Sequence, residues 1–370
     1  MYRYNGTEKL RCGYTTGTCA AAAAGAAAVS LLTGKAPESV TVRLPGGGTL
    51  LLPVSTPHSD ADSADCGIVK DSGDDPDVTN GITVRANVRR QSSGITILGG
   101  EGIGKVTRPG LDQPVGAWAI NSVPRRMIAD MLTETAEQLG YTGGFQVRIY
   151  VPGGAALAEK TYNPHMGILG GISIIGTTGI VEPMSTRALI ETIRTEASMR
   201  RAQGETTLIL TLGNYSGQFV RMALPIAEER TVTCSNYIGE ALDIGISLGF
   251  ERVLLIGHGG KLVKLGAGIM NTHSAQADGR METLVTCGLL AGADVQTLRR
   301  IPDCVTVDAA MDILEAAGML EQTMAVLMER IAYHLQKRVR SAVPAGAILF
   351  TFREGRIYRT ADADAMLERS

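Results

Sequence analysis

The sequence predicts an N-terminal α+β layered domain over residues 1–170 and a three-layer α/β domain with a mainly parallel sheet over residues 171–296. Three observations lead to this prediction. The chain of 370 residues is too long for one ordinary compact core. Strand-like stretches broken by Gly, Pro and Asp dominate its first part. From residue 171 onward, short apolar runs alternate with helical patterns, which is typical of parallel α/β units.

The first domain is expected to begin with a tightly packed helix. Residues 20–28 are alanine except for Gly25, and alanine combines high helix propensity with little bulk. Thr15, Thr16 and Thr18 precede this run, and such hydroxyls cap helix starts. A helix start also stabilises a bound carboxylate by roughly 0.3–1 kcal/mol. The pattern therefore leaves two interpretations open, a capped packing helix and an anion site.

The remaining elements of the first domain follow from local patterns. A helix is expected to open at Pro124 and to run to about Leu139. Strands are expected where apolar and β-branched residues lie between turn residues, at residues 39–44, 49–54, 81–87, 96–98 and 146–151.

The second domain has the alternating pattern of a Rossmann-like fold. Its strands are expected at residues 172–175, 207–212, 231–234 and 252–256. Helices should follow over residues 185–202, after residue 215, over residues 236–248 and near residues 261–265. Ligands of parallel sheets bind beyond the carboxyl ends of the strands. The four loops that follow the strands should therefore form one pocket, at residues 176–179, 213–216, 234–236 and 257–261.

The C-terminal part continues differently. Residues 297–344 should be a helical segment, with the clearest pattern over residues 308–340. Apolar residues at 347–352 and 356–358 predict a hairpin within residues 345–360, which we expect to join the first domain.

Charge and composition exclude several classes of protein. A formal net charge of −2 with interspersed signs argues against a nucleic-acid surface. No apolar run reaches the roughly 18 residues that a membrane span requires, and the alanine stretch lacks a clear signal-peptide cleavage site. The six cysteines form no CxxC pair and no zinc-finger spacing with histidine. We expect a cytoplasmic protein with reduced thiols and no metal site of its own, and a homo-oligomer remains open.

Two motifs nearly match known ligand sites. Residues 99–107 resemble a phosphate-binding P-loop, but Val106 stands where a hydroxyl should bind magnesium. A phosphotransferase that uses the loop Gly99–Thr107 remains an alternative. An aspartate-rich stretch around Asp75 lacks calcium-loop spacing. It is either a solvated turn or the source of a carboxylate that accepts a proton.

The stretch of residues 258–282 holds the densest set of charged and polar side chains in the chain. Its histidines, His258 and His273, lack a third residue at a metal-ligand spacing. Anchoring of a polycarboxylate by Lys261 and Lys264, or acid–base work by one histidine, is the preferred interpretation.

Six segments in order carry a family resemblance: GYTTGTCAAAAAGAAA, CGIVKDSGDDPDVTNG, GGEGIGKVTRPGL, AINSVPRRMI, GILGGISIIGTTGIVEPMS and LLIGHGGKLVKLGAGIMNTHSAQADGR. Together they resemble the cobalt-precorrin-5B C1-methyltransferases of anaerobic cobalamin biosynthesis, from about residue 8 to residue 290. The resemblance implies methyl transfer from S-adenosylmethionine to ring carbon C1 of a cobalt corrinoid, which brings its own cobalt. A corrinoid-binding protein without catalytic activity is a further alternative.

With this resemblance, the candidate residues take specific roles as expectations. The cofactor-binding candidates are Gly176, Thr177, Thr178, Gly179, Gly213, Asn214, Ser216, Gly257, His258, Gly259 and Gly260. The candidates for substrate carboxylates are Thr15, Thr16, Thr18, Arg125, Arg126, Lys261 and Lys264. Asp75 and His273 are the candidates for proton removal. The first domain is expected to cover the substrate.

Overall fold

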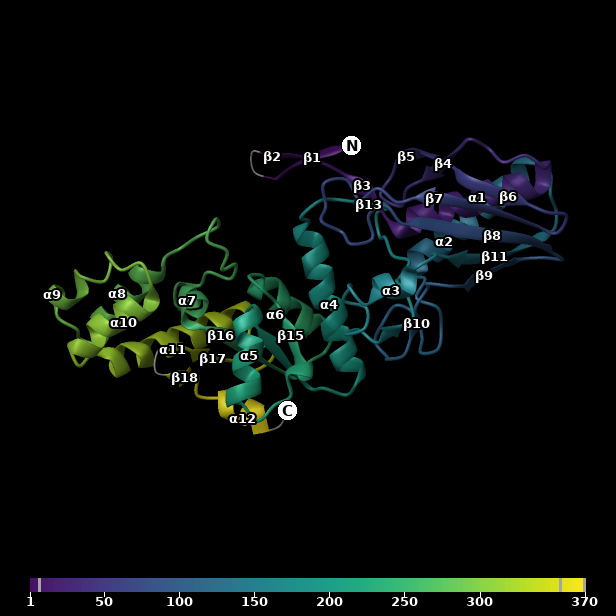
Figure 1. The fold of residues 1–370 in the computed structure, drawn as a ribbon. Coiled ribbons are helices and arrows are strands. Elements are labelled where there is room, and N and C mark those ends of the chain that lie inside the picture. Colours follow the sequence, from purple (N-terminus) through teal and green to yellow (C-terminus); the bar gives the residue numbers. More distant parts are fainter. Residues whose placement is uncertain (6–7, 353–354, 369–370) are drawn as a thin grey trace. The chain divides into compact units, whose positions relative to one another are not determined.

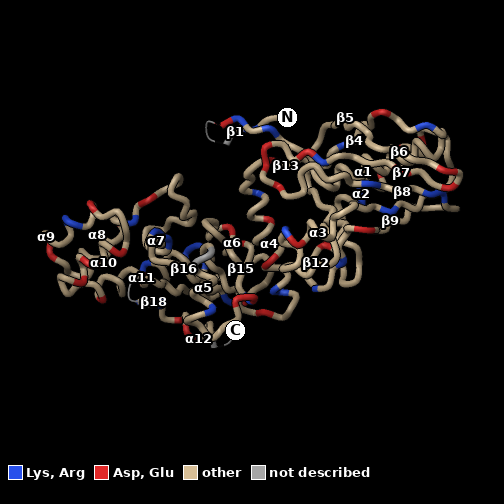
Figure 2. Tube along the Cα trace, in the orientation of Figure 1, with Lys and Arg blue, Asp and Glu red and all other residues tan. Residues whose placement is uncertain are grey.

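The structure, a computed structural model, describes residues 1–5, 8–352 and 355–368 (Figure 1). The chain divides into two compact units, unit 1 over Met1–Thr186 and unit 2 over Arg187–Ser370. Both contain helices and strands, in sheets of mixed direction. Basic and acidic residues are interspersed along the chain (Figure 2).

Unit 1 is built on a five-stranded sheet of order β6-β7-β8-β11-β9. Its strands are antiparallel except for the parallel pair of β9 and β11. The strands span Ser55–Ser59 (β6), Ser63–Val69 (β7), Thr83–Gln91 (β8), Ile95–Gly99 (β9) and Gly144–Tyr150 (β11). Burial alternates along β8, so alternate side chains point to opposite faces of the sheet.

Helix α1 (Thr16–Thr33) forms the centre of the unit 1 core. Thr15 caps it by accepting a hydrogen bond from the Thr18 N–H, and Gly34 ends it in the left-handed conformation. The alanines of α1 are completely buried among side chains of β7, β8 and helix α2 (Ser122–Gln138). Because alanine adds little bulk, helix and sheet approach closely, which explains the alanine run.

Short elements complete unit 1. Four two-stranded ladders pair β1 with β2, β3 with β13, β4 with β5 and β10 with β12. The bounds are Tyr2–Asn5 (β1), Glu8–Arg11 (β2), Gly13–Tyr14 (β3), Ser39–Arg43 (β4), Thr49–Pro53 (β5), Lys105–Val106 (β10), Gly154–Ala158 (α3), Ile168–Leu169 (β12) and Ile180–Val181 (β13).

Unit 2 is built on a five-stranded sheet of order β15-β14-β16-β17-β18. The first four strands are parallel, and β18 is antiparallel to β17. The strands span Thr207–Thr211 (β14), Thr231–Thr233 (β15), Arg252–His258 (β16), Ala345–Phe350 (β17) and Ile357–Arg359 (β18).

Helices cover both faces of this sheet. Leu208, Val253 and Leu255 belong to a large core with α4, α6, α8, α10 and α11, whereas Ile209 and Leu254 join a smaller core with α5 and α12. The helices span Thr186–Ala202 (α4), Asn214–Ala223 (α5), Ile238–Ser247 (α6), Gly259–Leu262 (α7), Arg280–Leu290 (α8), Val295–Leu298 (α9), Val307–Ala316 (α10), Leu320–Arg338 (α11) and Ala363–Glu368 (α12), with 3-10 turns at Glu228–Arg230 (η1) and Val263–Ala267 (η2).

Two expectations about the chain's division were wrong. Residues 172–175 were expected to be the first strand of the second domain, but they pair by isolated bridges with Ile103 and Ile120 of unit 1. The boundary therefore lies after Thr186 and not near residue 170. The C-terminal strands were expected in the first domain, but β17 continues the parallel sheet of unit 2 beside β16. Complete burial of Ala347, Ile348 and Leu349 stabilises this arrangement.

Helix α1 also corrects an expectation about membrane spans. Among the described residues it is the one helix long and apolar enough to cross a bilayer, with 18 residues and a mean hydropathy of 1.4. However, 83% of it is buried within the protein, where α2 and the sheet occupy its surface. We interpret α1 as a core helix.

Candidate functional site

The carboxyl ends of β14, β15 and β16 meet at one edge of the unit 2 sheet, as predicted for three of the four loops. At this edge Gly213 precedes α5, with a φ of 74° and a ψ of −178°. A residue with a Cβ atom is strained in that backbone conformation. Gly213 thus leaves the start of α5 open where a side chain would otherwise stand.

The ammonium group of Lys261 lies above this opening. Its Nζ would be 3.6 Å from a Cβ atom placed on Gly213. The side chain is half-buried, and burial lowers the pKa of Lys261 below its usual value. Lys261 makes no hydrogen bond or ion pair with the part of the chain that the structure describes. A half-buried cation without a carboxylate partner can bind the carboxylate of a ligand.

His258 stands at the end of β16 and caps α7. Its Nδ1 accepts a hydrogen bond from the Gly260 N–H at 3.1 Å, and its ring stacks on Phe352 with 4.6 Å between centroids. Nε2 is buried and has no partner among the described residues. Burial lowers the pKa of His258, and Asp308 opposes this shift. The unsatisfied Nε2 is a polar group to which a ligand can bond.

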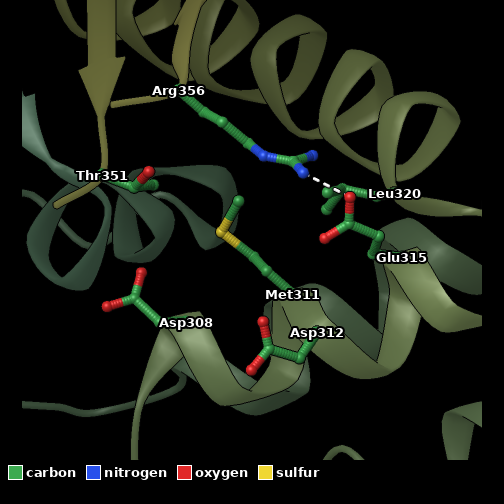
Figure 3. A pocket seen from close by; sticks show the side chains of 7 residues that line it. All are labelled: Asp308, Met311, Asp312, Glu315, Leu320, Thr351 and Arg356. Atoms are coloured by element: carbon green, nitrogen blue, oxygen red, sulfur yellow. Dashed lines mark hydrogen bonds and ion pairs between the residues drawn. The ribbon is translucent and has the colours of Figure 1, made fainter. Parts of the chain in front are cut away.

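A small pocket lies between α10 and the end of β17 (Figure 3). It is lined by acidic side chains that include Asp308 and Asp312, and an ion pair between Arg356 and Glu315 closes one side. Its volume of about 10 Å³ admits one water molecule. This pocket is therefore too small for a cofactor.

Other cofactor candidates of unit 2 have structural contacts. The buried Ser216 hydroxyl donates to the Leu212 carbonyl at 3.0 Å. A Cβ atom on Gly257 would be 2.3 Å from the Leu212 side chain, so close packing requires this glycine. Gly259 and Gly260 begin α7. Asn214 begins α5, but its side chain lies outside the described part of the structure.

The candidates at residues 176–179 do not belong to this edge. They lie in unit 1, where Thr177-Thr178-Gly179 contacts the identical segment Thr15-Thr16-Gly17 through a hydrogen bond from the Thr15 N–H to the Gly179 carbonyl. Thr18 Oγ1 donates to the Gly179 carbonyl at 2.7 Å, and the Gly46 N–H donates to the Thr178 carbonyl. The prediction that Gly176, Thr177, Thr178 and Gly179 end a strand of the cofactor domain was therefore wrong.

The predicted anion site at the start of α1 is also filled by protein groups. Thr16 Oγ1 accepts a hydrogen bond from the Ile175 N–H at 2.9 Å, and the Gly17 N–H donates to the Ile175 carbonyl at 3.0 Å. The Thr15 and Thr18 hydroxyls contact each other at 3.1 Å. Of the two interpretations, the capped packing helix is the one that the structure supports.

The predicted substrate cations have different surroundings. Arg125 Nε donates to the Ile120 carbonyl at 2.8 Å, and burial lowers the pKa of this guanidinium. Arg126 is exposed on α2. Lys264 is buried and donates to the Thr272 and Ala277 carbonyls, so it holds the loop that contains His273. Only Lys261 of this group lies at the strand-end edge.

The two candidates for proton removal lie in different units. Asp75 Oδ1 in unit 1 accepts a hydrogen bond from the Met184 N–H at 3.1 Å. His273 in unit 2 is exposed, and its Nδ1 accepts from the Ala275 N–H. The aspartates around Asp75 form a tied loop, because Asp71 pairs with Arg11 and Asp77 pairs with the buried Lys70.

The near-match to a P-loop does not have the geometry of one. Gly99 ends β9 and Lys105 begins β10, with no helix after the lysine. The Lys105 ammonium lies 4.7 Å from the centre of the Trp118 ring. The loop therefore lacks the helix N-terminus on which phosphate binding depends, and the phosphotransferase alternative gains no support.

The described residues offer no strong nucleophile and no group of three metal-binding side chains. All six cysteines are free, and burial raises the pKa of Cys19 and Cys234 to about 12. Sequence reasoning missed Phe352 and Asp308 at the strand-end edge. No motif marks them, because only the insertion of β17 beside β16 brings Phe352 to His258.

Comparisons with known proteins identify the chain. The family description "CbiD" matches residues 3–183, nearly all of unit 1, and "CbiD, C-terminal domain" matches residues 271–361. A cobalt-precorrin-5B C(1)-methyltransferase of Ruminiclostridium cellulolyticum is 43% identical over 93% of this chain and 90% of its own length. A protein of the same name from Edwardsiella ictaluri is 44% identical over 93% of this chain and 91% of its own length.

Among solved structures, the crystal structure of a cobalamin biosynthesis protein (CbiD) from Archaeoglobus fulgidus is 30% identical, with a TM-score of 0.41, and the match covers 74% of this chain and 86% of that one. The two-unit α/β protein is thus an enzyme of the methyltransferase class. It belongs to the family of the cobalt-precorrin-5B C(1)-methyltransferases, which confirms the resemblance carried by the sequence motifs.

Proposed function

We propose that this chain transfers a methyl group from S-adenosylmethionine to ring carbon C1 of cobalt-precorrin-5B, giving cobalt-precorrin-6A in cytoplasmic, anaerobic cobalamin biosynthesis. The observation that carries the proposal is the 43% identity to a curated methyltransferase of that name over 93% of the chain. Cobalt enters with the substrate, so the protein needs no metal site of its own for this reaction.

The strand-end edge of unit 2 fits the cofactor. Its parallel strands and two covering helix layers support a Rossmann-like cofactor unit. Lys261 would bind the methionyl carboxylate, and Gly213 gives that end of the cofactor room beside α5. The unsatisfied Nε2 of His258 would bond a polar atom of the nucleoside.

When bound, S-adenosylmethionine supplies a methyl group that its sulfonium already activates. The electron pair of the C–S bond would stay on sulfur, and the macrocycle would supply the electron pair of the new bond at C1. The protein's own task is alignment, and proximity alone can lower a barrier by roughly 7–11 kcal/mol. A strong nucleophile is unnecessary, in agreement with the high pKa of the buried thiols.

Asp75 and His273 remain our candidates for accepting a proton that the macrocycle releases. Asp75 retains an acceptor atom, since the contact that the structure shows uses only Oδ1. The acceptor of the neutral His273 ring is Nδ1, which would have to give up its hydrogen bond from the Ala275 N–H to take the proton. Asp75→Asn and His273→Gln should each flatten the acid limb of the pH–rate profile if that residue is the base. Profiles unchanged in both variants would exclude them.

Turnover tests the function directly. The purified chain should convert cobalt-precorrin-5B in the presence of S-adenosylmethionine and release S-adenosylhomocysteine in equal amount. Binding of the corrinoid without any turnover would favour the alternative, a corrinoid-binding protein without catalytic activity. Tight magnesium-dependent ATP binding would favour the phosphotransferase.

A further inference from the structure

The face of the unit 1 sheet opposite α1 carries a groove of about 650 Å³. Pockets that hold small molecules and cofactors usually measure roughly 300–1,000 Å³. The groove is lined by side chains of β7, β8, β9 and β11 together with Trp118. No candidate residue from the sequence lies in it, except that the Gly-rich loop contributes Gly99, Gly100 and Glu101.

Strand register places the polar side chains of the groove in rows. One row crosses four strands and contains Asp65, Asn87, Arg148 and Leu98. Arg89 lies two residues beyond Asn87 on the same face. Diagonal neighbours of this kind have Cα atoms about 7–8 Å apart. The two guanidinium groups, of Arg89 and Arg148, therefore project from neighbouring points of one surface.

These two arginines differ from the other charges of the groove. Arg85, Asp65 and Tyr150 bond one another, with 2.9 Å from Tyr150 Oη to Asp65 Oδ2. By contrast, Arg89 and Arg148 are exposed and have no hydrogen bond or ion pair with the residues that the structure describes. Glu101 is the remaining acidic side chain of the lining. With Asp65 neutralised by Arg85, the groove is positive.

The glycines of the near P-loop build the floor of the groove. A Cβ atom on Gly99 would be 2.5 Å from the Trp118 ring, so the ring lies directly on this backbone. A Cβ atom on Gly100 would be 3.1 Å from Arg148 Cδ. Gly99 and Gly100 thus allow the Trp118 ring and the methylene groups of Arg148 to pack closely on the backbone. An aromatic ring beside two unpaired guanidinium groups, with the Lys105 ammonium over the ring at 4.7 Å from its centre, suits a ring-shaped ligand with carboxylates at its rim.

We propose that this groove binds the cobalt-corrinoid substrate, with Arg89 and Arg148 paired to its peripheral carboxylates and the macrocycle against Trp118. The proposal rests on the proposed function, which supplies a planar polycarboxylate as substrate. It replaces Thr15, Thr16, Thr18, Arg125 and Lys264, whose polar groups bond to the protein itself.

Calorimetric titration of the full chain tests the groove with two stable corrinoids. Cobyrinic acid carries free carboxylates, and dicyanocobinamide carries amides at most of those positions. The double variant R89Q/R148Q should bind cobyrinic acid about 100-fold more weakly than wild type, from about tenfold for each charge-assisted contact. Binding of dicyanocobinamide should be weak and equal in both proteins. Equal affinity of wild type and double variant for cobyrinic acid, or no binding by wild type, would overturn the proposal.

Arg90→Gln is the matched control. Arg90 is the next residue on β8, but it points to the other face, where Nη2 donates to the Leu31 carbonyl at 2.8 Å. Arg90→Gln removes one positive charge, as each groove substitution does, and should leave the affinity for cobyrinic acid within twofold of the wild-type value. Hydrogen exchange of wild type provides a measurement independent of any variant. Bound cobyrinic acid should slow exchange in β8, β11 and residues 100–104, and protection confined to unit 2 would also overturn the proposal.

Turnover separates this proposal from the proposed function. If wild type forms methylated product and R89Q/R148Q does so with an unchanged KM, the substrate binds elsewhere and the function stands. If wild type binds cobyrinic acid through the two arginines but forms no product from cobalt-precorrin-5B, the groove stands and the methyltransferase proposal fails.

Discussion

Thr18 Oγ1 donates a hydrogen bond to the Gly179 carbonyl at 2.7 Å, which joins the first turn of α1 to the segment Thr177-Thr178-Gly179. The Thr15 N–H donates to the same carbonyl at 3.1 Å. That segment was expected at the cofactor, but these contacts make it part of the unit 1 core. We therefore propose the edge formed by Gly213, His258 and Lys261 as the cofactor site.

Replacement of Thr18 tests this reassignment. Thr18→Val removes a fully buried hydroxyl, and the free energy of unfolding should fall by about 1–2 kcal/mol, because Gly179 keeps only one donor. Affinity for S-adenosylmethionine should not change. Urea unfolding and calorimetry measure the two quantities. Thr33→Val, at the exposed end of α1, is the control, with a change within about 0.5 kcal/mol. A large loss of cofactor affinity in Thr18→Val would return the segment to the cofactor site.

Lys261→Met should weaken binding of S-adenosylhomocysteine by about 10- to 100-fold, the usual effect of losing a hydrogen bond to a charged group. Methylthioadenosine lacks the amino-acid carboxylate, so its affinity should be unchanged. Calorimetry with both ligands isolates the carboxylate contact. Lys337→Met, on the exposed surface of α11, is the control. Equal losses for the two ligands would contradict a contact between Lys261 and the carboxylate.

Titration of Lys261 should appear in the pH dependence of binding. Burial lowers its folded-state pKa below the ordinary 10.5, so between the two values the unfolded chain binds more protons and the stability of the fold rises with pH. Carboxylate binding has the opposite sign, because it needs the ammonium form. The affinity for S-adenosylhomocysteine should fall with rising pH before 10.5 is reached. The Lys261→Arg variant should show only the pH dependence of affinity that comes from titration of the ligand itself. The additional loss of affinity seen with Lys261 should be absent.

The pair of Lys70 and Asp77 should stabilise unit 1 in a pH-dependent way. Lys70 is 2% exposed, and its Nζ lies 2.7 Å from Asp77 Oδ2. Asp77→Asn leaves this ammonium without its partner and should cost about 3 kcal/mol of unfolding free energy. Asp62→Asn, an exposed carboxylate, is the control. Urea unfolding at neutral pH measures both, and equal small changes would contradict the role of the pair.

The pH dependence follows from the pKa of Asp77. Burial raises this pKa, but hydrogen bonds from Lys70 and Thr79 outweigh burial, so it lies below the usual 3.8. The stabilisation is therefore fully present above 3.8 and is lost as pH falls through the folded-state value. Below that value, wild type and Asp77→Asn should converge in stability.

Much of the fold could be predicted because local patterns agree with tertiary structure. The alanine run, the apolar runs before Gly213 and Gly257 and the turn residues between them all gave elements close to the observed α1, β14 and β16. The prediction for residues 172–175, a strand of the second domain, was wrong. Their apolar run suits a strand of either unit, and only hydrogen bonds such as that from the Gly104 N–H to the Ile172 carbonyl assign it to unit 1.

The candidate sites could be predicted only in part, for a similar reason. Lys261 was found because it follows a strand end directly in sequence. Lys264, three residues later, looks equivalent in sequence, but its ammonium donates hydrogen bonds to the Thr272 and Ala277 carbonyls. Arg89 and Arg148 were missed because they are far apart in the chain. Only the pairing of β8 with β11 places them on one surface.

Methyl transfer itself tests the account's central claim most directly. Wild type and Lys261→Met are incubated with cobalt-precorrin-5B and S-adenosylmethionine labelled with ¹³C in its methyl group, and the corrinoid product is examined by mass spectrometry and NMR. We predict that wild type places one labelled methyl on ring carbon C1 and that Lys261→Met does so at least about tenfold more slowly at limiting cofactor. Label at another carbon, no label, or equal rates in the two proteins would contradict the account.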